Sequence, residues 1–554
     1  MPKTSSFALG TAAVAGAKLL FVLSSYGTLL LLPRVLEDAA EFGRFATVLA
    51  LIGIIDNVIV ATTLQSVGRE IAGIGSSVST ALRFGLLRHA LPVIGVALIL
   101  ALCAALVTAW LRDDSLTRPL QVATASVAGY GLYAVFLGIL NGTQRFGLQA
   151  LVDGCFSLLR FAGLVLGAWF TGRAFGAFLG LGAGLGAMIL ICSAVVAHLA
   201  RPGLSVTAAS CSADPRTLSA GPDRGLQRAP QAGLTRGEAP DAMTHAPRDP
   251  HGTALKPWLS FVLPLLAFHL GINALLQLDI TLLKLFSGRM LLLEGASALE
   301  ASATSSRLAG HYRAAQSFAF VAYQLAVPLA LTAFPVISRL KREGARALTT
   351  TLVGTLRAAW LGALLIAIPI SANSGALLSF VYPEGYALAA TCLAVLAPGL
   401  ALFAVFVIVA TALAALGHPA RCALFALIGT LIMALGVARA LQTPLISEAS
   451  TLTRTASATS AGILASLVLA LYTLHTRGAP LPYRTLLGGG LAATAAWWAG
   501  YALSGEGFFR LLCAGGASAL VFVAASILTG AISLPELVQL RQAIHTRLRG
   551  RFQS

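Results

Sequence analysis

One apolar segment carries a stripe of polar side chains. His269, Asn273, Gln277, Thr281 and Lys284 follow one another at intervals of 4, 4, 4 and 3 residues, which places them on one face of a helix. Polar groups inside a long apolar segment normally face a protein interior or a water-filled cavity. The stripe therefore predicts one wall of a polar cavity. Hydrogen bonding between helices is the alternative, because single polar residues often join helices in this way.

Three further cations lie in apolar segments. Lys18 falls near the middle of the first segment, Arg160 belongs to the fifth, and Arg313 starts the eighth. Together with Lys284 they are the cationic candidates, which suit an anionic ligand through charge-assisted hydrogen bonds. Arg313 has two alternative positions. It lies at the mouth of the cavity, or its long side chain extends to the membrane interface beside Arg307.

Three carboxylates share these segments and are candidates for coupling to an ion gradient. Asp153 lies two helical turns before Arg160, and the two either pair across the cavity or join a fixed ion-pair network. Asp56 belongs to the second segment, and we predict that it pairs with Lys18, because consecutive helices are usually neighbours. Asp279 lies off the polar stripe. It either forms a structural pair with another side chain or contacts the ligand, and the sequence does not decide between the two.

Signs of enzymatic chemistry are weak. The seven cysteines are scattered and form no CxxC pair or Cys/His cluster. Glycine runs lack the Lys-Ser/Thr that would complete a nucleotide loop. The predicted outer loops are short, the two longest being Ser287–Ser306 and Gln442–Thr455, and they carry no catalytic constellation. The sequence therefore predicts a protein that is not an enzyme and uses neither metal nor cofactor.

Membrane-spanning helices must position these side chains. The chain is 57% hydrophobic and 11% charged, whereas soluble domains carry about 25% charged residues. Its apolar runs are also too long for barrel strands. With about 20 apolar residues per span, we predict an all-α polytopic membrane protein. The predicted spans, about 14 in number, are Phe7–Leu32, Phe45–Val67, Leu86–Leu111, Leu120–Leu140, Leu148–Thr171, Ala174–Leu199, Trp258–Phe286, Tyr312–Ile337, Thr351–Asn373, Tyr386–Leu416, Ala420–Leu441, Ala456–Leu474, Leu486–Leu503 and Phe508–Gly530.

Loop charges orient the predicted spans. The net charge is +17. With the N-terminus inside, the inner loops are basic, as at Arg339–Arg346, and the outer loops are mixed or acidic, as at Glu37–Glu41. This is the positive-inside pattern, and it predicts that both termini are cytoplasmic. The basic excess is then loop charge beside anionic lipid rather than a nucleic-acid surface.

The least hydrophobic stretch, 200–256, divides the spans. It is rich in proline and has no aromatic residue, so we predict a disordered cytoplasmic linker. A faint repeat relates its two sides: Gly43-Arg44-Phe45 and Gly310-His311-Tyr312 each start a helix. We therefore predict two pseudo-symmetric six-helix lobes in the same orientation. The predicted units are an N-terminal lobe (1–199), the linker (200–256), a C-terminal lobe (257–476), two extra transmembrane helices (477–530) and a basic cytoplasmic tail (531–554).

Several stretches also carry a family resemblance. They are Ala40–Ala46, Ile55–Asn57, Gly138–Leu151, Leu275–Phe286, Gly310–Ala315, Phe334–Leu340, Tyr382–Tyr386 and Leu416–Pro419. In their order and spacing the chain resembles the Wzx-type oligosaccharide flippases, polysaccharide biosynthesis proteins of the multidrug/oligosaccharidyl-lipid/polysaccharide (MOP) exporter superfamily. It departs from that family in its linker and in an insertion at Ser287–Ser306, and the smallest members lack the last two spans.

The resemblance implies a V-shaped cavity between the lobes, a bacterial inner membrane, and transport of an undecaprenyl-diphosphate-linked oligosaccharide by alternating access. It places the protein in O-antigen (lipopolysaccharide), capsule or exopolysaccharide biosynthesis. The expected partners are the lipid-linked oligosaccharide, membrane lipids and other polysaccharide assembly proteins, without nucleic acid. Expected substrate contacts are Lys18, Arg160, His269, Asn273, Gln277, Lys284 and Arg313, and expected ion-coupling residues are Asp56, Asp153 and Asp279.

Other functions stay open at this point. A lipid II flippase and a drug/cation antiporter belong to the same superfamily, although a cationic cavity disfavours the antiporter. A membrane glycan polymerase or ligase is the alternative from another class. Such an enzyme is expected to have a large outer loop with catalytic side chains, which the sequence does not suggest. A non-catalytic assembly scaffold is a further alternative function.

Overall fold

The computed structural model describes residues 3–74, 82–83, 85–143, 145–199, 255–343, 345–442 and 447–532. The predicted linker falls outside these ranges except for its last two residues, which open a helix, and 533–554 of the predicted tail also falls outside. Fourteen long helices dominate the described residues. They are α1 (Lys3–Val35), α2 (Ala39–Ile74), α4 (Leu91–Trp110), α5 (Thr117–Gly142), α6 (Phe146–Thr171), α7 (Ala174–Leu199), α8 (Leu255–Leu293), α9 (Ala298–Glu343), α10 (Ala345–Ala372), α12 (Ala390–Ala415), α13 (Pro419–Ala440), α14 (Glu448–Thr476), α15 (Tyr483–Leu503) and α16 (Phe508–Leu528).

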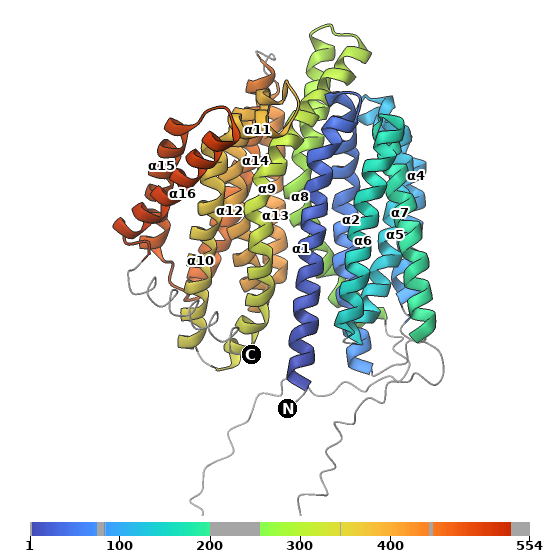
Figure 1. The fold of residues 1–554 in the computed structure, drawn as a ribbon. Helices are drawn as coiled ribbons and strands as arrows, with labels where there is room; N and C mark the ends of the chain where they lie inside the picture. The colour runs from blue at the N-terminus through green and yellow to red at the C-terminus, as the bar shows by residue number, and fades with distance from the viewer. Residues whose placement is uncertain are drawn as a thin grey trace, which may run out of the picture.

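Within the described residues, twelve helices are long and apolar enough to cross a membrane. The prediction of an all-α polytopic membrane protein is confirmed. The two long helices outside this set are α9 and α15. Charged residues such as Glu300, Arg307 and Arg313 interrupt the apolar character of α9, and α15 is rich in Gly, Thr, Trp and Tyr. Both nevertheless pack in the same bundle as the others (Figure 1).

Successive long helices run in alternating directions, so the turns fall at two ends of the bundle (Figure 1). We call the end at which α1 begins the N-terminal end, and the other the opposite end. The α8–α9 turn lies at the opposite end, as does the loop between α4 and α5. That loop includes a short 3₁₀ turn, Asp114–Leu116.

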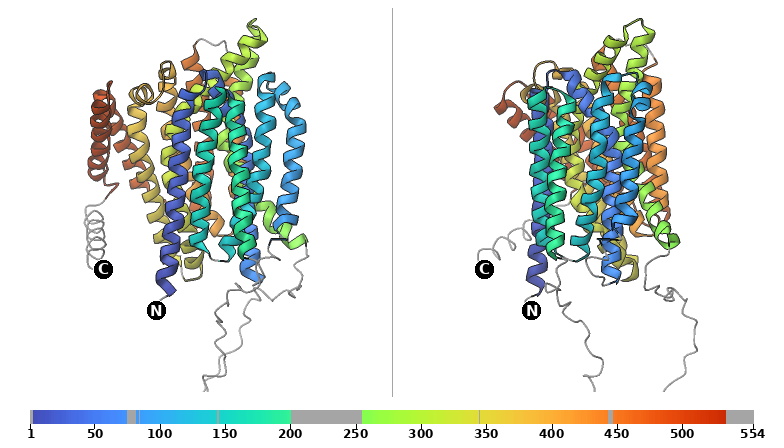
Figure 2. Two further views of the ribbon diagram at one scale, coloured as in Figure 1. Left: turned by 45° about the vertical axis from the view of Figure 1, so that its right-hand side comes forward. Right: turned by 90° about the vertical axis from the view of Figure 1, so that its right-hand side faces the viewer.

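The helices before and after the linker form two lobes with the same pattern of neighbours. In the N-terminal lobe α1 packs on α6, α6 on α7, α5 on α7 and α2 on α5. In the C-terminal lobe α8 packs on α13, α13 on α14, α12 on α14 and α9 on α12. Figure 2 shows the two groups of helices side by side. The helices therefore repeat in their packing as well as in sequence.

Helix α2 makes the main contact between the lobes, packing on both α8 and α9. A Cβ added to Gly43 would overlap the carbonyl oxygen of Ser306 and lie 2.9 Å from the backbone nitrogen of Gly310. A Cβ at Gly310 would lie 3.1 Å from the nitrogen of Gly43. Small residues permit such close approach of helices in membranes. The two glycines of the sequence repeat thus meet each other across the lobe interface.

The predicted insertion Ser287–Ser306 is mostly helical, which corrects its interpretation as a loop. α8 continues to Leu293, α9 begins at Ala298, and Gly295 in the turn has φ 92°. Arg289 and Met290–Leu293 continue α8, and alanine recurs at the start of α9. Arg, Met, Leu and Ala all have high helix propensity, which explains why the segment extends both helices. The resulting hairpin extends beyond its neighbours at the opposite end (Figure 1).

Helices α15 and α16 pair with each other and attach to the C-terminal lobe chiefly through α10. The Trp497 indole nitrogen of α15 donates a hydrogen bond to the Ser371 hydroxyl of α10 at 3.1 Å. Gly489 of α15 lies against the Trp360 ring of α10, where a Cβ would lie 2.7 Å from the indole nitrogen. These two helices therefore stand outside the contacts that join the lobes.

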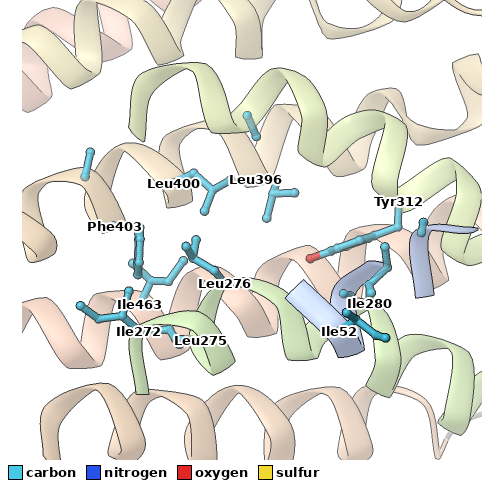
Figure 3. Packing of buried hydrophobic residues seen from close by; sticks show 14 of the residues in the cluster. Ile52, Ile272, Leu275, Leu276, Ile280, Tyr312, Leu396, Leu400, Phe403 and Ile463 are labelled. Carbon is cyan, nitrogen blue, oxygen red and sulfur yellow. The ribbon is translucent and has the colours of Figure 1, made fainter. Parts of the chain in front are cut away.

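Apolar side chains fill the C-terminal lobe (Figure 3). Leu276 of α8 and Leu396, Leu400 and Phe403 of α12 are buried there. Tyr312 of α9 enters the same cluster and is fully buried. A buried hydroxyl requires a hydrogen-bond partner, so this ring must be matched by a polar group inside the lobe.

Candidate functional site

The partner of Tyr312 is Asp279 of α8, which is also fully buried. The Tyr312 hydroxyl donates to Asp279 Oδ2 at 2.6 Å, and the Thr459 hydroxyl of α14 donates to the same oxygen at 3.2 Å. The backbone nitrogen of Ile280 donates to Oδ1 at 2.8 Å. Across the ranges that the structure describes, Asp279 forms no ion pair. Neutral donors thus hold this carboxylate at the junction of three helices.

Replacement of Tyr312 by phenylalanine is expected to destabilise the protein by about 1–3 kcal/mol, because it leaves Asp279 without its shortest hydrogen bond. The measurement is thermal unfolding of the purified protein in detergent. The matched control is Tyr323→Phe, in which the ring keeps its contact with Phe403 at 5.1 Å between centroids. Equal unfolding temperatures for the two variants would contradict a structural role for the Tyr312–Asp279 bond.

The N-terminal lobe contains a second buried carboxylate, Asp153 of α6. Its Oδ1 accepts a hydrogen bond from the Tyr133 hydroxyl at 2.6 Å, and its Oδ2 lies 3.0 Å from Lys18 Nζ. The Lys18 side chain is 55% exposed and that of Asp153 only 4%. The predicted Lys18–Asp56 pair is therefore wrong. α1 packs on α6 and barely contacts α2, so the nearest carboxylate to Lys18 comes from α6.

Asp56 of α2 has the fewest partners of the three carboxylates. The Ser126 hydroxyl of α5 approaches its Oδ2 at 3.4 Å, and its buried Oδ1 has no hydrogen-bond partner among the described residues. Arg160 of α6 acts on it electrostatically without forming an ion pair. A buried carboxylate this poorly satisfied is expected to take up a proton or a cation.

Arg160 does not pair with Asp153, although both belong to α6. Its Nη1 donates to the Ser25 hydroxyl of α1 at 2.7 Å, and its guanidinium carbon lies 4.9 Å from the centroid of the Phe21 ring. Its buried Nε finds no hydrogen-bond partner in the described part of the chain. The guanidinium group therefore retains a free donor inside the protein.

Arg313 of α9 is a second arginine with a buried donor, in the C-terminal lobe. It is buried, with 8% of its surface exposed. Its Nη1 donates to the Gln316 side chain at 2.7 Å, and its Nε has no hydrogen-bond partner among the described residues. Arg313 and Arg160 lie within electrostatic range of each other. We call these two residues the interlobe arginine pair.

Tyrosines surround the interlobe arginine pair. Tyr26 of α1 and Tyr382 act electrostatically on Arg313, and Tyr130 of α5 does so with Arg160. The buried hydroxyl of Tyr26 has no hydrogen-bond partner within the described residues. These aromatic hydroxyls were not predicted from the sequence. The available signal was their position in apolar segments, where a tyrosine needs a polar partner.

The polar stripe of α8 faces the N-terminal lobe rather than lipid. The Asn57 side-chain amide of α2 donates to Asn273 Oδ1 at 2.9 Å. Gln277 lies against Gly53 of α2, where a Cβ would lie 2.7 Å from Gln277 Oε1. Asn273 also donates to the His269 carbonyl at 2.9 Å. In this conformation Asn273 forms a hydrogen bond between helices, as the alternative interpretation of the stripe predicted. The contacts of the stripe with a substrate stay a prediction.

Lys284, the last residue of the stripe, is buried in an ion pair. Its Nζ lies 2.6 Å from Asp113 Oδ2, and the two side chains are 0% and 2% exposed. Lys284 also donates to the Ser306 hydroxyl of α9. Asp113 belongs to the α4–α5 loop, where burial alone would raise its pKa, but the Lys284 charge and hydrogen bonds from Lys284, Ser115 and Ser302 lower it. Asp113 falls between two predicted spans, and its contact with the other lobe could not be predicted because such a contact leaves no local sequence pattern.

Two other features do not contribute to this site. Within the described residues, no group of three or more His, Cys, Asp or Glu side chains is placed to hold a metal ion. An open pocket lies at the opposite end of α15 and α16, lined by Ala502, Leu503, Ser504, Phe509, Arg510 and Cys513. It is built from the two C-terminal helices and contains none of the predicted site residues.

The fold is similar to those of solved flippase and transporter structures. A solved structure of the lipid II flippase MurJ in an inward closed conformation matches with a TM-score of 0.65 at 12% identity, over 94% of this chain and 98% of that one. A Vibrio cholerae MATE transporter, VcmN, matches with a TM-score of 0.53 at 14% identity, over 86% and 99%. An inward-facing multidrug resistance MATE family transporter of the MOP superfamily matches with 0.53 at 11%, over 82% and 94%.

No protein-family model and no curated protein sequence gives a significant match. At these low identities the structural matches establish the fold. The predicted fold, an all-α polytopic membrane protein, is thereby confirmed.

Proposed function

We propose that this protein is a flippase that carries a polyprenyl-diphosphate-linked oligosaccharide across a membrane. The observation that supports this most is the interlobe arginine pair. Arg160 and Arg313 come from different lobes, lie within electrostatic range, and each keeps an unpartnered Nε–H among the described residues. Guanidinium groups bind phosphate oxygens through paired hydrogen bonds. Two of them within electrostatic range of each other favour a doubly charged headgroup such as a diphosphate.

A lipid-linked substrate explains why these charges lie inside the bundle. Its headgroup must cross an apolar layer about 30 Å thick, where an unpaired charge is costly. Arginines inside the bundle lower that cost, and nearby hydroxyls such as that of Tyr26 can satisfy sugar hydroxyls. The polyprenyl chain stays in lipid. Membrane lipids and other polysaccharide assembly proteins remain the proposed partners.

Lipid II flipping is the second candidate. It is favoured by the match to MurJ over nearly the whole length of both chains. Both substrates present a diphosphate to the interlobe arginine pair, so this pair does not distinguish them. Drug/cation antiport fits less well, because an arginine pair repels cations. A glycan polymerase or ligase fits less well because the described turns at the opposite end are short.

We place the N-terminal end of the bundle in the cytoplasm of a bacterial inner membrane. Arg88 and Arg145 belong to the segments that lead into α4 and α6, and Arg421 belongs to the first turn of α13; these three helices begin at the N-terminal end (Figure 1). Glu37 and Asp114 belong to the α1–α2 and α4–α5 turns at the opposite end. This distribution follows the positive-inside rule. The opposite end then faces outward, and both termini are cytoplasmic.

The function is tested by reconstitution of the full chain into liposomes that contain a fluorescent polyprenyl-diphosphate oligosaccharide. An impermeant quencher added outside is expected to reach a larger fraction of the fluorophore than in protein-free liposomes. A parallel set with fluorescent lipid II separates the two candidates, because the proposed substrate should move faster. Translocation of neither lipid would overturn the proposal, and faster movement of lipid II would favour the second candidate.

We propose that Asp56 is the coupling carboxylate, in preference to Asp153 and Asp279, because it has the fewest partners. Asp56→Asn is expected to make translocation insensitive to an imposed pH gradient, since the side chain can no longer gain or lose a proton. The measurement is the flipping rate in the same liposomes with and without the gradient. Asp114→Asn, at an exposed loop position, is the matched control. An unchanged response of Asp56→Asn would exclude Asp56.

A further inference from the structure

A buried ion pair joins the two lobes at the opposite end. Lys284 comes from α8 of the C-terminal lobe and Asp113 from the α4–α5 loop of the N-terminal lobe. They are 2.6 Å apart and excluded from solvent. The Ser306 hydroxyl of α9 bonds with Lys284 and approaches Asp113 Oδ2 at 3.4 Å. Both charges are therefore satisfied only while the lobes touch.

The loop that presents Asp113 is built around an unusual backbone conformation. Arg112 has φ 53°, the one positive φ at a non-glycine residue among those described. The backbone nitrogen of Asp113 then donates to the Thr108 carbonyl at 3.0 Å, and Asp113 Oδ1 accepts from the Ser115 backbone nitrogen at 3.1 Å. Left-handed backbone at an ordinary residue is strained and persists where surrounding contacts impose it. Here the hydrogen bonds with Thr108 and Ser115 orient the Asp113 carboxylate toward the other lobe.

The pair lies at the same end as the closest backbone contact between the lobes. Gly43 and Gly310 meet across the interface, and the Ser306 carbonyl oxygen lies against Gly43. Arg34 of α1 donates to the Val381 carbonyl of the other lobe at this end as well. The ion pair and the glycine contact thus close the same interface.

We infer that Lys284 and Asp113 form a latch that keeps the opposite end of the lobes closed and must break each time that end opens. This inference rests on the proposed transport by alternating access. It also reassigns Lys284, predicted as a substrate contact, to the gate. Separation of the lobes would leave two buried charges unpaired, which is strongly unfavourable until water or an anionic headgroup reaches them. The latch therefore keeps the empty protein shut at this end.

The test measures access to a buried residue of α2. Ala46 is one helical turn after Gly43 and is 1% exposed. Ala46→Cys is introduced into the full chain with its seven cysteines replaced by serine, and the rate of reaction with a hydrophilic maleimide is measured on purified protein. Asp113→Asn is expected to raise this rate on the order of tenfold or more. Lys284→Met, which keeps the aliphatic stem, provides the same test from the other lobe.

Two controls separate opening of the gate from loosening of the protein. Ala134→Cys, buried within the N-terminal lobe, should stay slow in every variant. Arg307→Gln breaks the ion pair with Glu448, which joins α9 to α14 within the C-terminal lobe, and should leave the rate at Cys-substituted Ala46 unchanged. Faster labelling at both reporters would mean unfolding and would overturn the latch.

A double variant completes the experiment. If Asp113 and Lys284 act through one interaction, Asp113→Asn combined with Lys284→Met should label Ala46→Cys no faster than the more strongly affected single variant. A labelling rate in the double variant that equals the product of the two single effects would contradict the latch. Unchanged labelling in either single variant, provided that it elutes as folded protein, would also contradict it. The readout needs no substrate, so it is independent of whether the translocated lipid has been identified correctly.

Discussion

Replacement of both Arg160 and Arg313 by glutamine is expected to lower the translocation rate by about 100-fold or more. Hydrogen bonds to charged groups contribute about 1.5–3 kcal/mol each, and a loss of 1.4 kcal/mol is about tenfold. Because the two guanidinium groups come from different lobes, each single variant should retain a partial rate. The measurement is quenching of the fluorescent lipid in proteoliposomes.

Lysine substitution tests whether geometry matters as well as charge. Arg160→Lys combined with Arg313→Lys keeps both charges but loses the planar fork of donors, so it should fall between the wild type and the glutamine variant. Arg307→Gln is the matched control, because Arg307 lies on the same helix as Arg313 but pairs with Glu448 at the surface. Wild-type translocation by the double glutamine variant would remove the arginine pair from the site.

Substitution of Gly43 by alanine is expected to prevent close approach of the lobes and to reduce translocation by more than about tenfold. The added methyl group would overlap backbone atoms of Ser306 on α9, which cannot move aside as a side chain would. Overpacking of this kind commonly costs about 1–3 kcal/mol. Gly310→Ala should act in the same way, because its methyl group would press on the backbone of Ala39 and Gly43.

The control for the glycine variants is Gly362→Ala. Gly362 lies inside α10, and a Cβ there meets nothing within 4 Å. The alanine should be neutral or slightly stabilising, since alanine has the higher helix propensity. Thermal unfolding and translocation are measured on all three variants. Wild-type translocation by Gly43→Ala would show that the contact between the two glycines is not needed during the transport cycle.

Much of the architecture follows from local pattern. Apolar length gives the spans, but α9 begins at Ala298, well before the predicted Tyr312. The repeat at Gly43 and Gly310 marks equivalent helices of the two lobes, α2 and α9, and the two glycines meet each other across the lobe interface. The prediction of a loop at Ser287–Ser306 was wrong, because the alanine, serine and threonine content of this segment suits a loop as well as a helix end.

The site was predictable in its residue types but not in its pairings. Charges in apolar segments pointed to Lys18, Arg160, Lys284 and Arg313, and all four contact polar or charged partners. The partners themselves were mostly wrong or missed. Lys18 pairs with Asp153 because α1 packs on α6, a neighbour that lies far away in sequence.

The sequence by itself determined that the chain is a bundle of membrane helices with two related halves and cations inside apolar segments, because the cost of placing polar groups in lipid leaves a pattern in every span. Only the tertiary structure decided what each cation does. Arg160 and Arg313 keep free donors between the lobes, whereas Lys284 is neutralised by Asp113. Ion pairs depend on distances of a few ångströms between helices, and those distances are fixed by how the lobes pack.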